Sequence, residues 1–401
     1  MKRASVLFVC SLFACLMMAS MAQAGGFQLF EYSNRGVAMA TTGYAIAGDA
    51  SVIATNPALM TKLEGQRALA GAVTISPQTS VYLDGNKNKT KANIHYVPHA
   101  YYTRQLEDNE NVWFGIGMFT RFGLGTEYDE NWAGKSGLQN VLLESVSLNP
   151  NLAFKFNDDF SMAVGLEVIK GGIALKRTIG TSEVSADTEG YAVGGNIGFT
   201  YDINDELTAG FHYRAPMRFV AHGKATSGTQ NTQNGQTIKS TLPSSFTLGL
   251  GYKPMDKWSI EFDTIYTRWE NTKSLIYDGL INSETSLKYK NTWRFQLGTE
   301  YWAQDWLALR FGYAYDQTPT RAGDASFMLP ANDRQLFSTG LGFKWDKWTA
   351  DWSFMYVIAK ERKGLAIDNG LAAAHPAYQK WNVDFKDGKT WITGMSIGYE
   401  F

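Results

Sequence analysis

Residues 337–345 read FSTGLGFKW, from Phe337 to Trp345, and this short stretch decides the fold class. Every odd position is apolar or threonine, and every even position is small or charged. Successive side chains of a β-strand point to opposite faces, so the alternation predicts a strand with one apolar and one polar face. The same period of two recurs at residues 246–252, 307–315 and 348–356.

The composition indicates where these strands lie. Aromatic residues make up 14% of the 401 residues, with 12 Trp and 20 Tyr, and there are 39 Gly. After residue 24 no apolar stretch approaches the roughly 20 residues of a membrane helix. Apolar faces paired with faces of Gly, Ser, Thr and charge are typical of an outer-membrane barrel, which turns the apolar face to lipid. A soluble β-sandwich is the alternative.

The connections favour the barrel. Short and long polar connections alternate along the chain, as expected for an up-and-down barrel with short periplasmic turns and long external loops. We therefore predict an all-β fold, a fourteen-stranded antiparallel transmembrane barrel with both ends on the periplasmic side. The short turns lie near residues 107–110, 157–159, 202–205, 254–256, 304–305 and 346–347, and the long loops span residues 84–91, 129–143, 180–189, 223–236, 270–284, 316–333 and 361–388.

The N-terminus predicts export. Lys2 and Arg3 precede an apolar run at residues 6–18, and residues 22–24 (Ala-Gln-Ala) form a small-x-small cleavage site. Residues 1–24 are therefore interpreted as a secretory signal peptide. A membrane anchor is the less favoured alternative, because the apolar run is short for a bilayer.

Removing the signal peptide changes the chemistry available to the chain. Cys10 and Cys15 are the two cysteines and both lie in it, so the mature chain has no disulfide or thiol site. A lipoprotein alternative at Cys15 would place the lipidated cysteine inside the apolar run. Loss of Lys2 and Arg3 lowers the basic count from 37 to 35 against 38 acidic residues, a balance of −3. No polybasic patch points to nucleic acid.

The segment after the signal peptide has neither strand alternation nor a sustained helical stripe. Residues 25–64 read GGFQLFEYSNRGVAMATTGYAIAGDASVIATNPALMTKLE, rich in Gly and Ala. A segment of this kind ahead of a barrel has one economical place, inside the lumen, where it would gate the pore. The predicted organisation is a signal peptide at 1–24, an N-terminal hatch (plug) at 25–65 and a transmembrane barrel at 66–401.

One cation stands out as a ligand-binding candidate. In the strand that begins near Met162, even positions are apolar, so odd positions such as Glu167 face the lumen. The same parity places Arg177 on the inner face near the external mouth, where a guanidinium can bind a carboxylate. The alternative is a lumen salt bridge with Glu167 or another wall acid. A bulge at Gly171-Gly172 would reverse the parity.

The third strand, residues 112–126, carries Gly115, Gly117, Gly123 and Gly125. Glycine inside a strand marks a bend, a bulge or a close approach of backbones. Residues 122–125 near its external end are therefore a candidate opening in the barrel wall, and simple barrel curvature is the alternative.

Patterns for catalysis and metal binding are weak. Residues 394–398 match G-x-S-x-G but lie within the last strand, with no helix to follow, so we interpret the match as chance. The five histidines show no close ligand spacing, so we expect no metal and no cofactor. Charged residues expected to face the lumen most often brace a barrel interior; they are Glu261, Asp263, Arg294, Glu300, Arg310 and Asp351.

Several stretches resemble the FadL/TodX family of outer-membrane transporters for hydrophobic compounds. They span essentially the whole mature chain: residues 26–29 (GFQL), Asp49-Ala50, residues 56–59 (NPAL), residues 122–128 (FGLGTEY), and residues 336–345 after Pro330 and Asp333-Arg334.

The resemblance implies a fourteen-stranded barrel with a hatch, which passively takes up long-chain fatty acids or, in the TodX branch, monoaromatic hydrocarbons. It implies that Arg177 contacts the ligand head group. The hatch and gating residues would be Phe27, Asn56, Pro57 and Ala58, and the lateral opening would be formed by Arg121, Phe122, Gly123 and Gly125.

The expected setting is the outer membrane of a Gram-negative bacterium. The expected partners are a hydrophobic small molecule, outer-membrane lipids and lipopolysaccharide, and the barrel assembly machinery, through the terminal aromatic Phe401. We expect a monomer and no enzyme. Two other classes remain open: a lipid-hydrolysing outer-membrane enzyme, and a nonspecific porin or adhesin.

Overall fold

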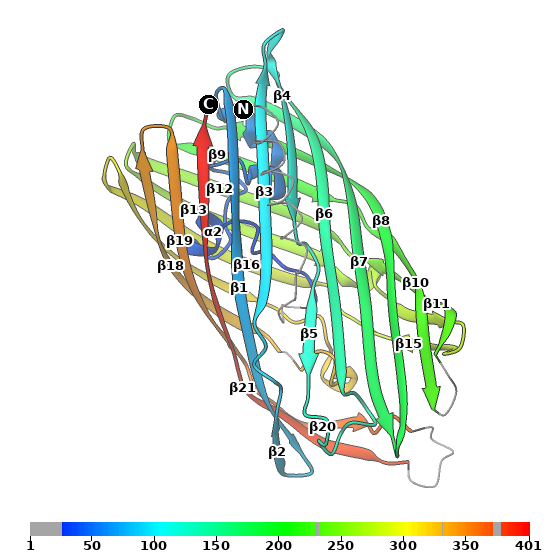
Figure 1. Ribbon diagram of the computed structural model, residues 1–401. Coiled ribbons are helices and arrows are strands. Elements are labelled where there is room, and N and C mark those ends of the chain that lie inside the picture. Colours follow the sequence, from blue (N-terminus) through cyan, green and yellow to red (C-terminus); the bar gives the residue numbers. More distant parts are fainter. Residues whose placement is uncertain (1–25, 229–231, 331, 372–377) are drawn as a thin grey trace, which may run out of the picture.

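The structure is a computed structural model that describes residues 26–228, 232–330, 332–371 and 378–401. The predicted signal peptide lies outside the described residues. All strands belong to one sheet (Figure 1). It closes on itself, because β1 (Gln66–Leu83) pairs antiparallel with β21 (Lys380–Glu400) from Arg67↔Glu400 to Leu83↔Val383. The predicted closed antiparallel barrel of fourteen strands is confirmed.

Some of the fourteen spans are interrupted. The third span consists of β4 and β5, the seventh of β9 and β10, and the eighth of β11 and β12, whereas β2, β14, β15 and β20 belong to external connections. The C-terminus lies at the end of the barrel that carries the short turns (Figure 1). The strands are β1 Gln66–Leu83, β2 Asn86–Lys89, β3 His95–Leu106, β4 Asn109–Phe119, β5 Leu124–Glu127, β6 Asn140–Lys155, β7 Phe160–Ile179, β8 Ser182–Asp202, β9 Leu207–Arg214, β10 Met217–Gly228, β11 Gln233–Leu242, β12 Ser244–Met255, β13 Trp258–Arg268, β14 Ser274–Asp278, β15 Ser283–Ser286, β16 Thr292–Gln304, β17 Leu307–Asp316, β18 Arg334–Trp345, β19 Trp348–Ala359, β20 Arg362–Asp368 and β21 Lys380–Glu400.

Several predicted external loops are wrong in extent, because strands extend into them; residues 140–143 belong to β6 and residues 380–388 to β21. Residues 180–189 are not a loop, because β7 and β8 continue as a paired hairpin to Ile179↔Ser182. Most of residues 223–236 likewise belongs to β10 and β11, which pair as far as Ala225↔Gln233. Polar residues on both faces of a hairpin hide the alternation that marks a strand, so these extensions read as loops in the sequence.

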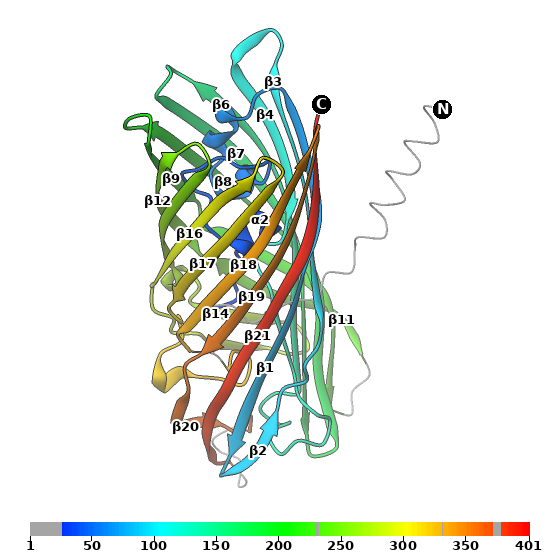
Figure 2. The ribbon, with the colours of Figure 1, turned by 90° about the vertical axis from the view of Figure 1, so that its left-hand side faces the viewer.

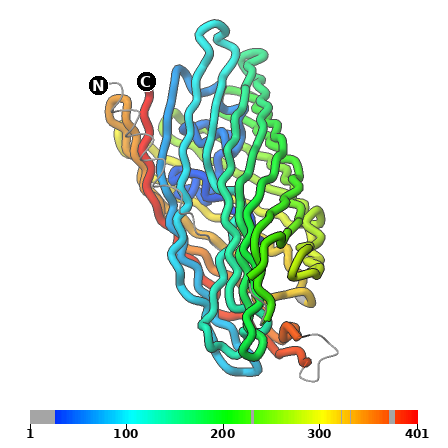
Figure 3. The backbone as a smooth tube through the Cα atoms, turned by 45° about the vertical axis from the view of Figure 1, so that its right-hand side comes forward, coloured from blue at the N-terminus to red at the C-terminus, as the bar shows by residue number. Residues whose placement is uncertain are grey.

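Residues 26–64, here called the hatch segment, lie inside the barrel, most of them in its periplasmic half (Figure 3). The segment contains three short helices, α2 (Asn34–Ala38), α3 (Val52–Thr55) and η1 (Pro57–Lys62). Ser33 caps α2 by accepting a hydrogen bond from the Gly36 N–H at 3.1 Å. Within the described residues no helix is long and apolar enough to cross a membrane; the remaining short helices are η2 Trp269–Asn271 and η3 Ala322–Asp324.

Lumen-facing glycines of the wall contact the hatch segment. A Cβ added to Gly298 would lie 2.5 Å from Thr42 Oγ1, and one added to Gly340 would lie 2.4 Å from the Ala38 Cβ. Any side chain there would displace the segment. Other wall glycines at which a Cβ would come within about 3 Å of this segment are Gly115, Gly117, Gly198, Gly210, Gly249, Gly251, Gly312 and Gly394.

Two of these glycines distinguish between the alternatives drawn from the sequence, which were a bend, a bulge or a close approach of backbones. A Cβ on Gly115 would lie 2.3 Å from the Met60 sulfur, and one on Gly117 would lie 3.0 Å from Ile53. They permit close approach of the hatch segment, and the break in this span comes later.

Candidate functional site

A wall carboxylate binds the middle of the hatch segment. Glu261 Oε1 on β13 accepts hydrogen bonds from three consecutive backbone N–H groups, of Gly43 at 3.1 Å, Tyr44 at 2.6 Å and Ala45 at 2.7 Å. The Gly43 N–H also lies 3.3 Å from Asp263 Oδ2. One buried side chain thus satisfies the backbone donors of a whole turn, which holds the turn against the wall.

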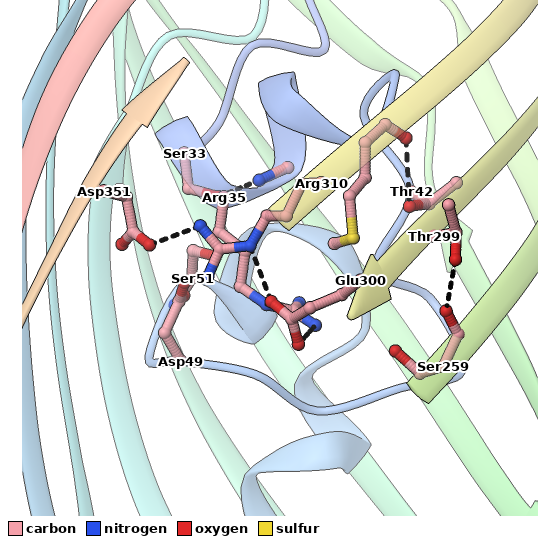
Figure 4. Close-up of polar contacts among 12 residues, drawn as sticks. Ser33, Arg35, Thr42, Asp49, Ser51, Ser259, Thr299, Glu300, Arg310 and Asp351 are labelled. Atoms are coloured by element: carbon pink, nitrogen blue, oxygen red, sulfur yellow. Dashed lines mark hydrogen bonds and ion pairs between the residues drawn. The ribbon is translucent and has the colours of Figure 1, made fainter. Parts of the chain in front are cut away.

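A buried ion network holds the first helix of the segment (Figure 4). Arg35 contacts Glu300 through Nε at 3.1 Å and Nη2 at 3.2 Å. Arg310 on β17 contacts the same Glu300 at 2.6 Å and Asp351 on β19 at 2.5 Å. The expected bracing of the lumen by wall charges is therefore present. The sequence did not reveal that Arg35 of the hatch segment takes part in it.

The Asn56-Pro57-Ala58 motif joins the hatch segment to the wall at β8. The Asn56 amide donates to the carbonyl oxygens of Tyr44 and of Phe199 on β8, both at 2.9 Å. Its Oδ1 accepts from the Ala58 N–H at 3.2 Å, and Pro57 occupies the first turn of η1, where a missing N–H costs no hydrogen bond. The motif therefore lies buried inside the barrel.

The third span breaks between β4 and β5, at residues 120–123. The first residues of the hatch segment fill part of this break: the Leu29 N–H donates to the Arg121 carbonyl at 2.8 Å, and the Gly123 N–H donates to the Phe27 carbonyl at 2.7 Å. Gly125 lies just beyond the break, where β5 pairs with β6. The backbone at the break is therefore hydrogen-bonded to the N-terminal end of the hatch segment as well as to the neighbouring strand.

Because of the break, the edge of β3 that faces the third span is unpaired over part of its length, whereas its other edge stays paired with β1. Pairing between β3 and β4 ends at Ala100↔Met118, on the periplasmic side. On the external side, Lys91 Nζ contacts Glu127 at 2.5 Å, and this hydrogen bond raises the pKa of the Lys91 ammonium. Asn93 adds a hydrogen bond of 2.7 Å to Glu127. The gap between the second and third spans is thus closed at both ends.

The Arg121 side chain turns into the barrel. It is fully buried and lies 3.0 Å from Glu167 on β7, which Arg214 on β9 also contacts at 2.6 Å. Arg214 donates in turn to the Ala54 carbonyl of the hatch segment at 2.8 Å. The alternative that pairs Glu167 with Arg177 is therefore wrong, because ten residues of about 3.3 Å each separate the two along one strand.

Arg177 lies in the outer half of the barrel, as the strand parity predicts. The register of β7 with β6 and β8 continues without a shift through Gly171-Gly172. The Arg177 Nη1 donates to the Gly370 carbonyl at 3.2 Å. Among the ion pairs of the described residues, none involves Arg177.

Arg177 lines an external cavity of about 750 Å³. The loop after β17 covers it with Phe327, whose carbonyl accepts from the Tyr128 hydroxyl at 3.0 Å. Asp368 and Glu284 supply the acidic part of the lining. The apolar lining is formed by Leu138, Leu175, Val184, Ala186, Tyr277, Ile281, Ala325, Phe327, Met328, Ile367 and Leu371.

Apolar side chains connect this cavity with the break. Phe27 and Leu175 both pack against the buried cluster that contains Phe122 and neighbouring wall residues. The Phe27 ring centroid lies 4.8 Å from that of Trp269 and 5.9 Å from that of Phe122. Leu175 faces the cavity. Phe27 therefore contacts the apolar clusters that border both the cavity and the break.

Sequence comparison finds relatives that span nearly the whole chain. The long-chain fatty acid transport protein of Escherichia coli O6:H1 is 25% identical over 447 residues, which cover 97% of each chain. Outer membrane protein P1 of Haemophilus influenzae is 27% identical over 412 residues, covering 87% of this chain and 89% of that protein.

Structural comparison gives the same fold. The crystal structure of a Pseudomonas aeruginosa FadL homologue matches with a TM-score of 0.85 at 18% identity, covering 94% of this chain and all of that chain. The Pseudomonas putida toluene transporter TodX matches with a TM-score of 0.71 at 16% identity, covering 92% and 98%. The family model described as outer membrane protein transport protein (OMPP1/FadL/TodX) matches residues 15–401. The chain therefore belongs to the OMPP1/FadL/TodX family of outer-membrane transport proteins.

Proposed function

We propose that this protein is a passive outer-membrane channel for hydrophobic molecules, and that its substrates are long-chain fatty acids. The observation that carries the proposal is the external cavity of about 750 Å³, which combines an apolar lining with Arg177. Its volume falls within the range of about 300–1,000 Å³ that is usual for small-molecule sites. The relatives named as long-chain fatty acid transport proteins support this substrate class.

The cavity offers a fatty acid two kinds of contact. Each buried CH₂ group contributes about 0.8 kcal/mol, so an acyl chain supplies most of the affinity. The guanidinium of Arg177 can bind a carboxylate through two parallel hydrogen bonds. At present the guanidinium makes one hydrogen bond to an uncharged acceptor, the Gly370 carbonyl, and a carboxylate can replace that acceptor. No ATP is required, because diffusion down a concentration gradient drives the transport.

Release requires a path past Phe27. We propose that the N-terminal end of the hatch segment shifts, which removes Phe27 from Trp269 and Phe122 and weakens the ligand contacts. The ligand then leaves sideways, through the break formed by Arg121, Phe122 and Gly123, into the outer leaflet. The deeper part of the segment keeps its bonds to Glu261 and Glu300, so the lumen below stays closed to water.

The head-group role of Arg177 can be tested directly by substitution. Arg177→Ala should reduce oleate uptake by cells about tenfold or more, because a hydrogen bond to a charged group contributes about 1.5–3 kcal/mol. Arg177→Lys should recover part of the uptake, since it keeps the charge. Unchanged oleate uptake by a well-expressed Arg177→Ala variant would show that the arginine does not bind the head group.

Arg177→Ala also distinguishes a fatty-acid channel from a monoaromatic-hydrocarbon channel of the same fold. A monoaromatic hydrocarbon has no carboxylate, so toluene uptake should not depend on Arg177. Loss of both uptakes would point to damage of the cavity. Planar-bilayer conductance tests the alternative of a nonspecific porin, which would carry large currents. An assay of lipid hydrolysis by the purified protein tests the alternative of a lipid-hydrolysing enzyme.

A further inference from the structure

A groove on the outer face of the barrel is lined by residues of β1, β2, β19 and β21. These strands lie together at the external end of the barrel (Figure 2). The volume of the groove is about 490 Å³. It is separate from the external cavity, because Gln78, Lys389 and Ile358 are direct neighbours across three strands and their alternate residues, such as Thr390 and Val357, face inward. The lining residues are Gln78, Ser80, Lys87, Lys89, Tyr356, Ile358, Ala359, Glu361, Asp387, Gly388 and Lys389.

The groove lies at the outer edge of the apolar belt. From Trp391 to Phe401 the outward positions of β21 are apolar, aromatic or threonine. The ten steps between these two residues, at about 3.3 Å each and with a strand tilt of about 40°, span roughly 25 Å, the usual height of the lipid-facing band. Tyr356 packs on Trp391 with ring centroids 4.3 Å apart. Lys389 is the next outward position and therefore lies at headgroup level.

The charges of the groove are unequal. Its two acids have cationic partners: Asp387 lies 3.4 Å from Lys87, and Glu361 lies 2.9 Å from Lys363. The ion pairs found among the described residues include none with Lys89 or Lys389, and both side chains are exposed. The groove thus carries three lysines against two acids, directly above apolar side chains, and Lys389 shares the charge of Asp387 with Lys87.

We propose that this groove binds the phosphorylated headgroup of one lipopolysaccharide molecule of the outer leaflet. Lys89 and Lys389 contact a phosphate as point charges, and Lys87 exchanges part of its contact with Asp387 for the same group. The acyl chains of that molecule lie along Tyr356, Ile358 and the belt below. Clusters of lysine at the membrane surface attract anionic lipid in this way. This site is independent of transport through the lumen.

The test measures lipid binding to the full-length mature protein. Bisphosphorylated lipid A is titrated in detergent and its complex is counted by native mass spectrometry. The double variant Lys89→Gln with Lys389→Gln should bind it about thirty-fold more weakly than the unsubstituted protein. Lipid A from which both phosphates have been removed should bind both proteins equally and weakly.

A matched pair of lysines controls for net charge. Lys257→Gln with Lys347→Gln removes two exposed cations at the opposite end of the barrel and should leave lipid A affinity within about twofold. Equal affinity of the Lys89/Lys389 variant and the unsubstituted protein, or equal weakening by the control pair, would overturn the proposal. Strong binding of dephosphorylated lipid A would overturn it as well. Heat-modifiable electrophoretic migration shows that each variant is folded.

Discussion

Glu261→Ala tests whether the wall holds the hatch segment in place. The carboxylate accepts three buried backbone N–H bonds, from residues 43–45. The Gly43 N–H keeps Asp263 as an acceptor, so the substitution leaves the Tyr44 and Ala45 donors unsatisfied. Each buried unsatisfied donor costs about 1–3 kcal/mol, so the two together cost about 4 kcal/mol within a range of about 2–6. A change of about 5.5 kcal/mol would convert an equilibrium of 99 parts bound segment to 1 part released segment into the reverse ratio. We therefore expect the middle of the segment to leave the wall for a measurable fraction of the time.

Two measurements detect the release of the hatch segment from the wall. Hydrogen exchange of peptides that contain residues 43–45 should accelerate by at least two orders of magnitude, and planar bilayers should show a new conductance. Glu261→Gln is the matched variant: its amide oxygen can still accept these bonds, so exchange should change much less. Wild-type exchange and no added current in a folded Glu261→Ala barrel would refute the reasoning.

Two further substitutions test other contacts of the hatch segment. Gly298→Leu should displace Thr42, which a Cβ would approach to 2.5 Å, and open a leak to large antibiotics in a barrel that still migrates as folded. Gly195→Ala should not, because its Cβ would lie 3.6 Å from the nearest neighbouring atom, the Gly165 carbonyl oxygen. Arg121→Ala leaves Glu167 with one cation, and removing a partner from a buried ion pair costs about 3–5 kcal/mol. Its unfolding midpoint in guanidinium should fall, and restoration by Arg121→Lys to the wild-type midpoint would contradict a requirement for the guanidinium.

The barrel was predictable because its signal is local. A strand that faces lipid on one side and the lumen on the other must alternate, as FSTGLGFKW does, and each strand carries this pattern independently of its neighbours. The inward position of Arg177 followed from the same parity. The hairpin of β7 and β8 was missed, because polar residues on both faces leave no alternation to detect.

The contacts of the hatch segment were not predictable, because they join residues far apart in sequence. Arg35 and Glu300 are separated by 265 positions, and nothing in either neighbourhood marks them as partners. The wall glycines were visible in the sequence, but a glycine that admits another backbone and one that bends a strand look alike. Gly115 admits the hatch segment within β4, whereas Gly123 lies in the break between β4 and β5.

The sequence by itself therefore determined the class of architecture and the face on which each strand residue lies, since the period of two depends only on neighbouring residues. Only the folded barrel shows which wall residues hold the hatch segment, that Glu167 pairs with Arg121 and Arg214, and that Phe27 packs on Trp269 and Phe122. These arrangements depend on barrel closure, which brings distant strands around one lumen and lets a single carboxylate or glycine contact a segment more than two hundred residues away.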